Sequence, residues 1–584
     1  MPRSGVGAGH MRLALLAPGV GPGAHSDPDK EVAMGPLHPS RLLGWAGCFA
    51  CVLLVSLPVA AATALRIIPP DRSTFAVGQR FDLRVEATGL PAGDAHLTLA
   101  LNGAPVTELG GAKLVEGSSG AGKLELTARN VSIQAPMAAT LTATLQYPDG
   151  TLDATSTFRV VDTVGPAPRA KNVILMIGDG MGVAHREAAR AVSRGLKAGR
   201  YNDYLEMETM QVLGMVSTSA LNAFVTDSAN GATAYAGGNK TDNGALCAWP
   251  DDTSDSMDNP QFETIASYLK RTRNMAIGIV TTSTVGDATP AAFLAHNYAR
   301  GDTSEIVNQY PGIMPEVLMG GGRSSFGAAL RAKFTDAGRV YVTTAAELQA
   351  LPADAKGCLG LFSNDVMATY VDRAQALRKG SGTGLTEPSI VQMTEAALNI
   401  LSKYPNGFFL MVEEALIDKQ SHSNDATRAV WETIEFDRAV GVAKRFAESH
   451  GDTLVIVTAD HETGAVTLND LTGGTAPKLA TSIGNVTVMP GEGMVEPPYV
   501  AQASGSKSHT GVDVPLTASG PGATQFGRVM DATEVFFGML RAIDGGYAQG
   551  PGPSAVAGDL NGDGVKDLAD VVVLLRQVVG LAGR

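Results

Sequence analysis

Cysteine is scarce in this chain, which has four cysteines among its 584 residues. Cys48 and Cys51 fall in an apolar N-terminal stretch, and Cys247 and Cys358 follow later in the chain. So few cysteines exclude a disulfide framework as the basis of the fold. An oxidising compartment would permit Cys247 and Cys358 to pair, and the sequence leaves open whether they meet.

Positive charge is also in short supply, because 45 lysines and arginines stand against 58 aspartates and glutamates, for a formal net charge of −13. A surface that binds nucleic acid is basic, so this balance argues against one. The acidic excess suits a well-dispersed protein and one that gathers cations. Long internal repeats are absent, and the length of the chain predicts two to four domains.

Residues 1–64 have the character of a leader with a signal peptide. Arg41 precedes the uncharged stretch LLGWAGCFACVLLVSLPVAAATA, which ends in small residues typical of a signal-peptidase site near Ala62 or Ala64. Met34 is a candidate for the true start. The apolar run also approaches the length of a membrane span, which is the alternative. We expect export to the periplasm or the extracellular space, because the Ala-rich tail suits cleavage.

Residues 65–165 alternate apolar and polar positions in short runs such as RFDLRVEATG and KLELTARNVSI, with Gly, Pro and Asn-Gly between them. This is the pattern of short antiparallel strands, and it predicts an Ig-like β-sandwich. The segment contains no cluster of His, Asp or Cys that would support chemistry. We interpret it as a structural or binding accessory domain.

Residues 166–545 follow a different pattern, in which continuous apolar runs alternate with helical stretches. NVILMI, MAIGIVTT, GFFLMV and DTLVIVTA are typical of strands buried on both faces, and EPSIVQMTEAALNILSKY is typical of a helix. Such alternation predicts an α/β domain with a doubly wound, largely parallel sheet. Ligands of such sheets gather at the carboxyl ends of the strands.

Acidic residues follow all four of these apolar runs, and histidines accompany two of them. The residues in question are Asp179, Asp287, Glu413, Asp418, His422, Asp460 and His461. A single acid after a strand is commonplace, for example as a helix N-cap. Four such sites at one sheet edge would crowd like charges, which is costly unless cations lie among them. Mixed His and carboxylate ligands suit Zn²⁺, whereas all-oxygen sets with a hydroxyl suit Mg²⁺.

Ser228 stands next to Asp227 in FVTDSANGATAYAGG, a segment of almost exclusively small residues after the serine. Either the backbone packs closely there, or a charged group must approach Ser228. Serine needs a base or a metal to act as a nucleophile, and no histidine lies beside it in sequence. We therefore favour metal activation, with the small residues leaving room for a phosphate.

Five blocks resemble the signature segments of alkaline phosphatases, in that family's order over residues 171–541: ILMIGDGMG, VTDSANGATA, DATPAA, VEEALIDKQSH and VIVTADHETG. The resemblance implies hydrolysis of phosphate monoesters through a phosphoserine on Ser228, with two Zn²⁺ and one Mg²⁺. Arg300 would clamp two phosphoryl oxygens, and Asp227 would orient Arg300 or the local backbone. Lys419, with Asp287, is similar to a bacterial variant of the site in which Lys contacts phosphate through water.

The same resemblance implies a ligand set for each metal. One zinc would be held by Asp418, His422 and His509. The other zinc would be held by Asp179, Asp460 and His461. The magnesium ligands would be Asp179, Asp287, Thr289 and Glu413.

Other residues near the motifs receive a structural interpretation. Glu414 is taken as structural, and His185 and His296 as packing or surface histidines. Ser421 departs from close bacterial relatives, which often have Asp there, and we expect it to tune the site without changing the reaction class. The crown-like insert of the family is not recognisable, so a homodimer stays open.

Residues 546–584 begin with a Gly/Pro/Ala-rich linker and continue into DLNGDGVKDLAD. This loop resembles an EF-hand and one half of a dockerin, and it predicts a Ca²⁺ site. The expected calcium ligands are Asp559, Asn561, Asp563, Val565, Asp567 and Asp570. A solvated acidic loop is the alternative, and docking to a partner stays open because dockerins normally carry two copies.

The sequence as a whole predicts an exported alkaline phosphatase that acts on small phosphate monoesters. Two alternatives remain. One is a phosphodiesterase of the same superfamily, against which Ser228, the DAT block and Arg300 argue. The other is a surface-attached binding protein with a vestigial catalytic domain, against which the complete set of metal ligands argues.

Overall fold

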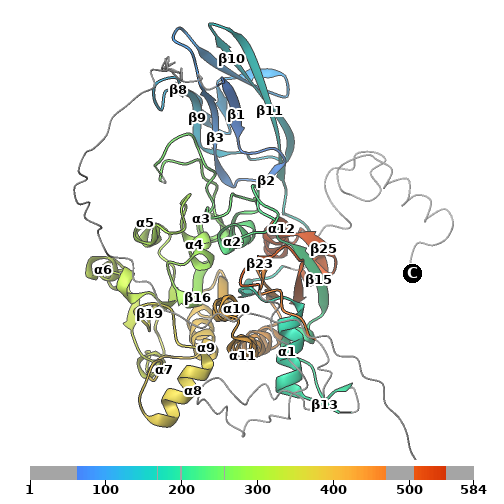
Figure 1. Ribbon diagram of the computed structural model, residues 1–584, viewed down its shortest axis with the longest axis vertical. Coiled ribbons are helices and arrows are strands. Elements are labelled where there is room, and N and C mark those ends of the chain that lie inside the picture. The colour runs from blue at the N-terminus through green and yellow to red at the C-terminus, as the bar shows by residue number, and fades with distance from the viewer. Residues whose placement is uncertain (1–61, 168, 198–199, 256, 469–505, 547–584) are drawn as a thin grey trace, which may run out of the picture. The chain divides into compact units, whose positions relative to one another are not determined.

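The structure is a computed structural model that describes residues 62–167, 169–197, 200–255, 257–468 and 506–546 (Figure 1). The predicted leader up to residue 61 and the predicted calcium loop, residues 559–570, lie outside these described residues. Within the described ranges, none of the helices combines the length and the apolarity that crossing a bilayer requires.

The alternating N-terminal segment forms two sheets. The first contains, in order, β1 (Ala64–Ile68), β3 (Arg80–Thr88), β9 (Leu124–Ser132) and β8 (Val115–Gly117). The second contains β2 (Ser73–Ala76), β11 (Gly150–Val161), β10 (Met137–Tyr147), β4 (His96–Leu101) and β5 (Ala104–Val106). A small pair, β6 (Glu108–Leu109) and β7 (Ala112–Lys113), accompanies them.

Pairing in these two sheets is antiparallel except between β2 and β11, which run parallel. On β10, Leu141, Ala143 and Leu145 are buried while the residues between them are less so, as the alternation requires. The predicted short antiparallel strands are thus present, and their Ig-like character stays a prediction.

The N-terminal strands are joined to the following domain by buried polar contacts. The side-chain amide of Gln79 donates to the backbone carbonyls of Gly237, at 3.0 Å, and Glu263, at 2.9 Å. Arg84 forms an ion pair with Asp251, with Nη1 2.6 Å from Oδ2. Because these groups are shielded from water, each contact costs more to lose than a surface contact would.

Residues after 170 build a mixed, mostly parallel sheet of ten strands. Its order is β18 (Val340–Val342), β19 (Cys358–Leu361), β17 (Val317–Gly321), β16 (Ala276–Thr284), β20 (Phe408–Glu414), β12 (Asn172–Gly178), β21 (Thr453–Thr458), β24 (Val514–Ser519), β15 (Val212–Ser217) and β25 (Val529–Asp531). The exception to parallel pairing is β24, which is antiparallel to both neighbours. The four predicted apolar runs are the adjacent strands β16, β20, β12 and β21, so the predicted α/β sheet is confirmed.

Helices cover both faces of this sheet (Figure 1). On one face, α9 (Ile390–Leu401) and α11 (Ala426–His450) contact the central strands, and α1 (Val183–Arg194), α8 (Tyr370–Lys379) and α10 (Leu416–His422) pack on α11. On the other face lie α3 (Ile265–Arg273), α4 (Ala288–Leu294) and α12 (Ala532–Asp544), with α2 (Ser228–Gly237) contacting α4 and α12.

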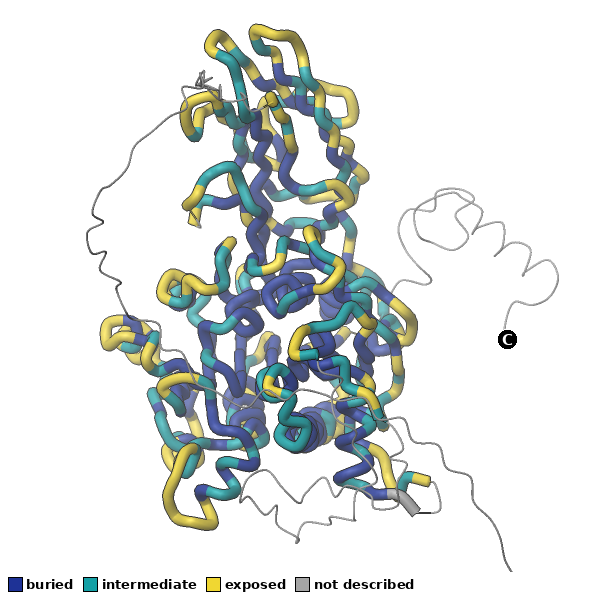
Figure 2. Tube along the Cα trace, viewed as in Figure 1, coloured by how far each residue is buried: buried dark blue, intermediate teal, exposed yellow. Residues whose placement is uncertain are grey.

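The remaining elements are short or peripheral. They are α5 (Thr303–Gln309), α6 (Ala328–Asp336), α7 (Ala345–Gln349), β13 (Leu196–Lys197), β14 (Arg200–Tyr201), β22 (Glu462–Thr463) and β23 (His509–Thr510), with 3₁₀ turns at Glu206–Glu208, Tyr310–Gly312, Arg323–Ser325 and Ala523–Phe526. In Figure 2 the central strands of the large sheet are dark blue, and many exposed positions lie in the connections. The apolar core therefore lies between the sheet and its two helical layers.

The small residues of α2 are explained by close packing. All ten residues of this helix are buried. A Cβ atom at Gly231 would lie 2.9 Å from the carbonyl oxygen of Asp460, and one at Gly237 would lie 2.3 Å from the ring of Phe262. Backbone crowding thus accounts for these two glycines, and the room for a phosphate beside Ser228 stays a prediction.

Cys247 and Cys358 do not form a disulfide. Both are buried free thiols, Cys247 on a loop and Cys358 on β19. The pairing that the sequence left open is therefore absent from this structure.

Candidate active site

The acids that follow the apolar runs meet at one edge of the sheet. Asp179 follows β12, Asp287 follows β16, and Asp460 follows β21, while Glu413 lies near the end of β20. These strands are neighbours, so their carboxyl ends bring the side chains together. Gly180 turns the chain after β12 with a φ of +73°, and a Cβ there would lie 2.9 Å from the Cα of Asp418.

Ser228 is the first residue of α2, and Asp227 caps this helix by accepting a hydrogen bond from Asn230 N at 3.1 Å. The serine therefore sits at the positive end of the helix dipole. Its Oγ lies 3.1 Å from His461 Nε2, and the residue is buried. A hydroxyl in this position is held next to the acids at the sheet edge.

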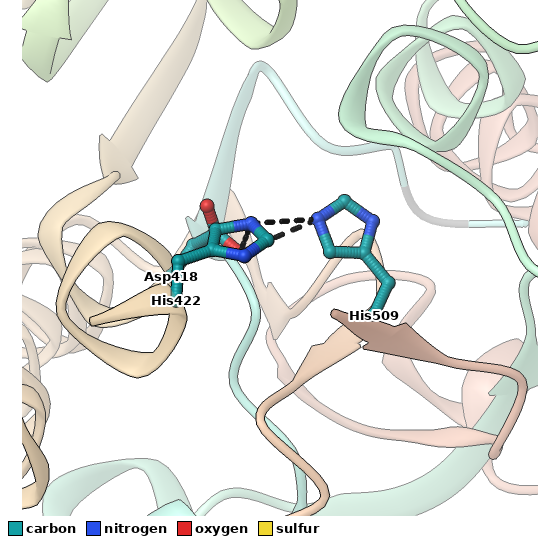
Figure 3. A group of neighbouring side chains, drawn as sticks. All are labelled: Asp418, His422 and His509. Carbon is teal, nitrogen blue, oxygen red and sulfur yellow. Dashed lines mark hydrogen bonds and ion pairs between the residues drawn. The ribbon is translucent and has the colours of Figure 1, made fainter. Parts of the chain in front are cut away.

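Asp418, His422 and His509 point toward one another from α10 and β23 (Figure 3). Oδ1 of Asp418 lies 3.3 Å from His422 Nε2 and 3.6 Å from His509 Nε2. The two Nε2 atoms are 3.1 Å apart. Although burial opposes ionisation, the neighbouring side chains of His422 and His461 hold the pKa of Asp418 below its ordinary value.

The three histidines near Ser228 each engage Nδ1 elsewhere. Nδ1 of His422 contacts the carbonyl of Lys507, and Nδ1 of His509 lies 2.9 Å from the carbonyl of Thr226. Nδ1 of His461 lies 3.2 Å from Thr463 Oγ1. A carbonyl only accepts, so His422 and His509 carry their proton on Nδ1 and direct the Nε2 lone pair inward. This is the arrangement of metal-binding histidines, and with a carboxylate it fits Zn²⁺.

A second set of ligand atoms surrounds His461. Atoms of Asp179, Asp418 and His461 all lie within 4.8 Å of one another. His461 Nε2 is also 3.5 Å from Asp179 Oδ1 and 3.2 Å from Asp460 Oδ2. Both of these oxygens are buried and have no hydrogen-bond partner among the described residues. Burial, together with the charges of Asp460 and Asp418, raises the pKa of Asp179 well above its ordinary value, which a cation at this point would reverse.

The predicted magnesium ligands add an all-oxygen group beside these residues. Burial raises the pKa of Glu413 to about 7, and its carboxylate accepts a hydrogen bond from Thr281. The hydroxyl of Thr289 is buried beside the Glu413 carboxylate. Buried oxygens of this kind fit a hard cation.

Asp287 is paired with two cations. Its Oδ2 accepts from Lys419 Nζ at 2.9 Å, and its Oδ1 accepts from Arg300 Nη2 at 3.1 Å. Although burial opposes ionisation, these charges lower the pKa of Asp287 below its ordinary value. Arg300 also donates to Asp227 Oδ2 at 3.0 Å, so Asp227 orients this arginine as the sequence suggested.

The structure brings the predicted residues of the catalytic domain together at this edge of the sheet, while their individual roles stay predictions. They are Asp179, Ser228, Asp287, Thr289, Arg300, Glu413, Asp418, Lys419, His422, Asp460, His461 and His509. Sequence reasoning missed Thr463, whose hydroxyl contacts both Asp418 and His461. The position of Thr463 two residues after His461, in a block already singled out, is the signal that would have identified it.

Comparison with known proteins assigns the chain to a family. Residues 170–490 match the family model described as alkaline phosphatase. The chain belongs to the alkaline phosphatase family. Streptomycin-6-phosphate phosphatase of Streptomyces griseus is 34% identical over 65% of this chain and 91% of its own length. Alkaline phosphatase of Escherichia coli strain K12 is 33% identical over 67% of this chain and 89% of its own length.

Solved structures of alkaline phosphatases have a similar fold. The cold-active enzyme of Shewanella sp. matches with a TM-score of 0.54 at 27% identity, covering 64% of this chain and 99% of that protein. The enzyme of the Antarctic bacterium TAB5 matches with a TM-score of 0.51 at 28% identity, covering 64% of this chain and 98% of that protein. The chain is therefore a phosphatase that hydrolyses phosphate monoesters.

Proposed function

We propose that hydrolysis proceeds through a phosphoserine on Ser228, with two Zn²⁺ and one Mg²⁺ as cofactors. The observation that supports this most directly is the orientation of His422, His461 and His509. Each ring uses Nδ1 for a protein contact and directs Nε2 toward buried carboxylates, and Nε2 of His461 also lies 3.1 Å from the Ser228 hydroxyl.

The donor atoms fit this division of metals. Asp418, His422 and His509 would hold one zinc, and Asp179, Asp460 and His461 the other. Asp179, Asp287, Thr289 and Glu413 would hold magnesium through oxygen alone. Bound zinc supplies Lewis-acid chemistry that favours an ionised hydroxyl and stabilises a leaving oxygen. A mutant of the TAB5 enzyme whose structure contains bound Mg matches this chain with a TM-score of 0.50 at 27% identity.

The residues of this chain would then act in two steps. Ser228 Oγ attacks phosphorus, the bond from phosphorus to the ester oxygen breaks, and the alcohol leaves with a proton. Water next attacks the phosphoserine, which releases inorganic phosphate and restores the serine. Arg300 would hold two phosphoryl oxygens throughout, and Lys419 would contact phosphate through water.

The decisive experiment compares the wild-type chain with Ser228→Ala, using p-nitrophenyl phosphate and bis(p-nitrophenyl) phosphate as monoester and diester. We expect the monoester to be preferred, and Ser228→Ala to lower kcat by at least about 10³-fold while the zinc content stays unchanged. Acid quenching with labelled substrate should trap phosphate on wild-type protein only. Ser449→Ala, at an exposed position of α11, serves as the control.

The other outcomes separate the alternatives. Equal activity in Ser228→Ala would remove the proposed mechanism. Preference for the diester would favour a phosphodiesterase of the same superfamily. A chain that binds neither zinc nor substrate would favour the vestigial binding protein.

We also propose, from sequence features alone, that residues 1–64 direct export and that residues 559–570 bind calcium. The segments 65–165 and 166–545 would be the accessory and catalytic domains. N-terminal sequencing of the mature chain tests export, since an intact leader would oppose it. Calcium titration of wild type against Asp563→Ala tests the loop, and the oligomeric state in solution decides whether a homodimer forms.

A further inference from the structure

A second group of buried acids lies behind the site, on the other face of the sheet. Glu413 and Glu414 are consecutive on β20, so their side chains point to opposite faces. The hydroxyl of Thr282 donates to Glu414 Oε1 at 2.6 Å on this second face. Helix α11 brings Glu432 and Glu435 to the same place. We call Glu414, Glu432 and Glu435 the triglutamate cluster; its ligand oxygens all lie within 4.8 Å of one another.

The cluster is buried and carries more negative charge than its observed ion pair balances. Glu414 and Glu432 are 0% exposed, and Glu435 is 4% exposed. Arg373 of α8 forms an ion pair with Glu435, and its Nη1 donates to the carbonyl of Ala368 at 2.7 Å. Burial and the neighbouring acids raise the pKa of Glu432 well above its ordinary value.

Two oxygens of the cluster lack any partner in the described part of the chain. Glu414 uses Oε1 to accept from Thr282 and from Leu416 N, the latter at 3.2 Å. Glu432 uses Oε1 to accept from Tyr370 N at 2.6 Å. Oε2 of Glu414 and Oε2 of Glu432 are buried and accept no hydrogen bond. Arg373 offsets part of the charge of all three glutamates, but it donates to neither of these two oxygens. Buried carboxylate oxygens without donors are expensive, so a further positive group is expected between them.

We propose that the triglutamate cluster binds a Ca²⁺ ion, separate from the metals of the active site. Its donors are oxygens alone, which selects a hard cation over zinc. Calcium is favoured over magnesium because Mg²⁺ keeps several waters and is seldom bound in a dry cage of protein oxygens. The ion would join β20, which carries Glu413, to helix α11, and so support the active site from behind.

The calcium content of the protein tests the proposal, provided that the predicted C-terminal loop can no longer bind calcium. The background is therefore the full-length chain with Asp559→Ala and Asp563→Ala, saturated with zinc and magnesium and then gel-filtered. We expect one calcium per chain in this background by elemental analysis, and its loss in the same chain with Glu432→Gln. Glu395→Gln, at an exposed position of α9, is the matched control and should retain the calcium.

Terbium luminescence provides a second measurement that needs no cluster variant to fold. Trp431 lies next to Glu432 in sequence, and its ring stacks on Tyr370 with centroids 5.1 Å apart. Tb³⁺ bound at the cluster should therefore emit when tryptophan is excited, and Ca²⁺ should displace it. Trp431→Phe should reduce this emission while the calcium content stays the same.

The results that would overturn the proposal are equally definite. Magnesium recovered in place of calcium, or calcium content unchanged by Glu432→Gln, would reject it. A background chain with no calcium and no tryptophan-sensitised emission would mean that protons shared among the three carboxylates neutralise the cluster. None of these results depends on the phosphoserine mechanism. A failure of the calcium proposal can therefore be distinguished from a failure of that mechanism.

Discussion

Arg300 lies between two carboxylates, with Nη1 3.0 Å from Asp227 Oδ2 and Nη2 3.1 Å from Asp287 Oδ1. These contacts orient a planar guanidinium whose fork matches two phosphoryl oxygens. We expect Arg300→Lys to lower kcat/KM for a phosphate monoester by about 10²-fold, because an ammonium cannot make the bidentate contact. Steady-state kinetics measure the change. Arg159→Lys, at an exposed position of β11, is the control, and an unaltered kcat/KM in Arg300→Lys would contradict the assigned clamp.

His185 is a buried neutral histidine beside the site. Gly182 N donates to its Nδ1 at 3.2 Å, and its Nε2 donates to Ser421 Oγ at 2.9 Å, while Ser421 donates in turn to the carbonyl of Ile417. Burial lowers the pKa of His185 to about 4, from an ordinary value of 6.5. The unfolded chain therefore takes up a proton at a higher pH than the folded chain does.

The consequence is a loss of stability in acid. Above pH 6.5 the neutral His185 costs the folded chain no free energy of unfolding. As the pH drops from 6.5 toward 4 the free energy of unfolding falls, by up to about 3 kcal/mol for this group. We expect His185→Gln to flatten the dependence of the melting temperature on pH in this window. Scanning calorimetry of both proteins measures it, with His450→Gln at the exposed end of α11 as the control. An identical dependence in wild type and His185→Gln would show that His185 does not titrate as described.

The site residues that follow buried strands could be predicted from the sequence, whereas contacts made by loop residues could be predicted less well. Asp179, Glu413 and Asp460 follow from the rule that parallel strands share their carboxyl edge. The carbonyl of Lys507, which receives the Nδ1 proton of His422, carries no signal in sequence, because any residue supplies a carbonyl. Such contacts depend on how the chain returns to the site, which local pattern does not reveal.

Helix α2 is the element that places the nucleophile, and its position depends on the glycines that let it approach the sheet. At Gly231, a Cβ atom would meet the backbone oxygen of Asp460 at 2.9 Å and its Cβ at 3.0 Å. We expect Gly231→Ala to push α2 away from Asp460, and so to lower kcat and the affinity for zinc together. Kinetics and zinc titration measure both. Gly117→Ala, where a Cβ would meet nothing within 4 Å, is the control, and wild-type values for Gly231→Ala would contradict the crowding.

At the same scale, the strands of the sheet differed in how clearly they could be predicted. The central strands are long apolar runs, which buried parallel strands require. β24 is the short segment Val514–Ser519 with Pro515 and a threonine inside it, and it enters antiparallel between β21 and β15. Its place rests on tertiary pairing rather than on composition, so a reading of local pattern could not locate it.

For the whole molecule, a change in periodicity near residue 165 marks where one domain pattern gives way to another. What the pattern could not show is how firmly the two parts are joined. The side-chain amide of Gln79 donates a hydrogen bond to the carbonyl of Gly237, the last residue of α2, and Arg84 forms an ion pair with Asp251. A segment that looked like an appendage thus contacts the end of the helix that begins with the nucleophile.

Metal removal should change the stability of the whole molecule in a pH-dependent way. Without ions, Glu413 is a buried carboxylate whose pKa is raised to about 7, from an ordinary value of 4.5, mainly by burial. Between pH 4.5 and 7 the folded chain therefore retains a proton that the unfolded chain has released. The contribution of this group to the free energy of unfolding is fully present below pH 4.5 and is lost as the pH rises through 7. For this group the loss reaches about 3 kcal/mol, and Asp179, also raised by burial, acts with the same sign.

Bound cations would keep these carboxylates ionised in the folded chain and remove that loss. We therefore expect the melting temperature of chelator-dialysed protein to fall further below that of metal-loaded protein at about pH 8 than at about pH 5.5. Scanning calorimetry of both forms measures the gap, and Glu413→Gln should reduce its growth with pH. If the difference in melting temperature instead narrows as the pH rises, the acids at the sheet edge are not held together by metal ions. The buried carboxylates of the apoprotein retain protons because no cation balances their charge, and this is what makes the difference grow with pH.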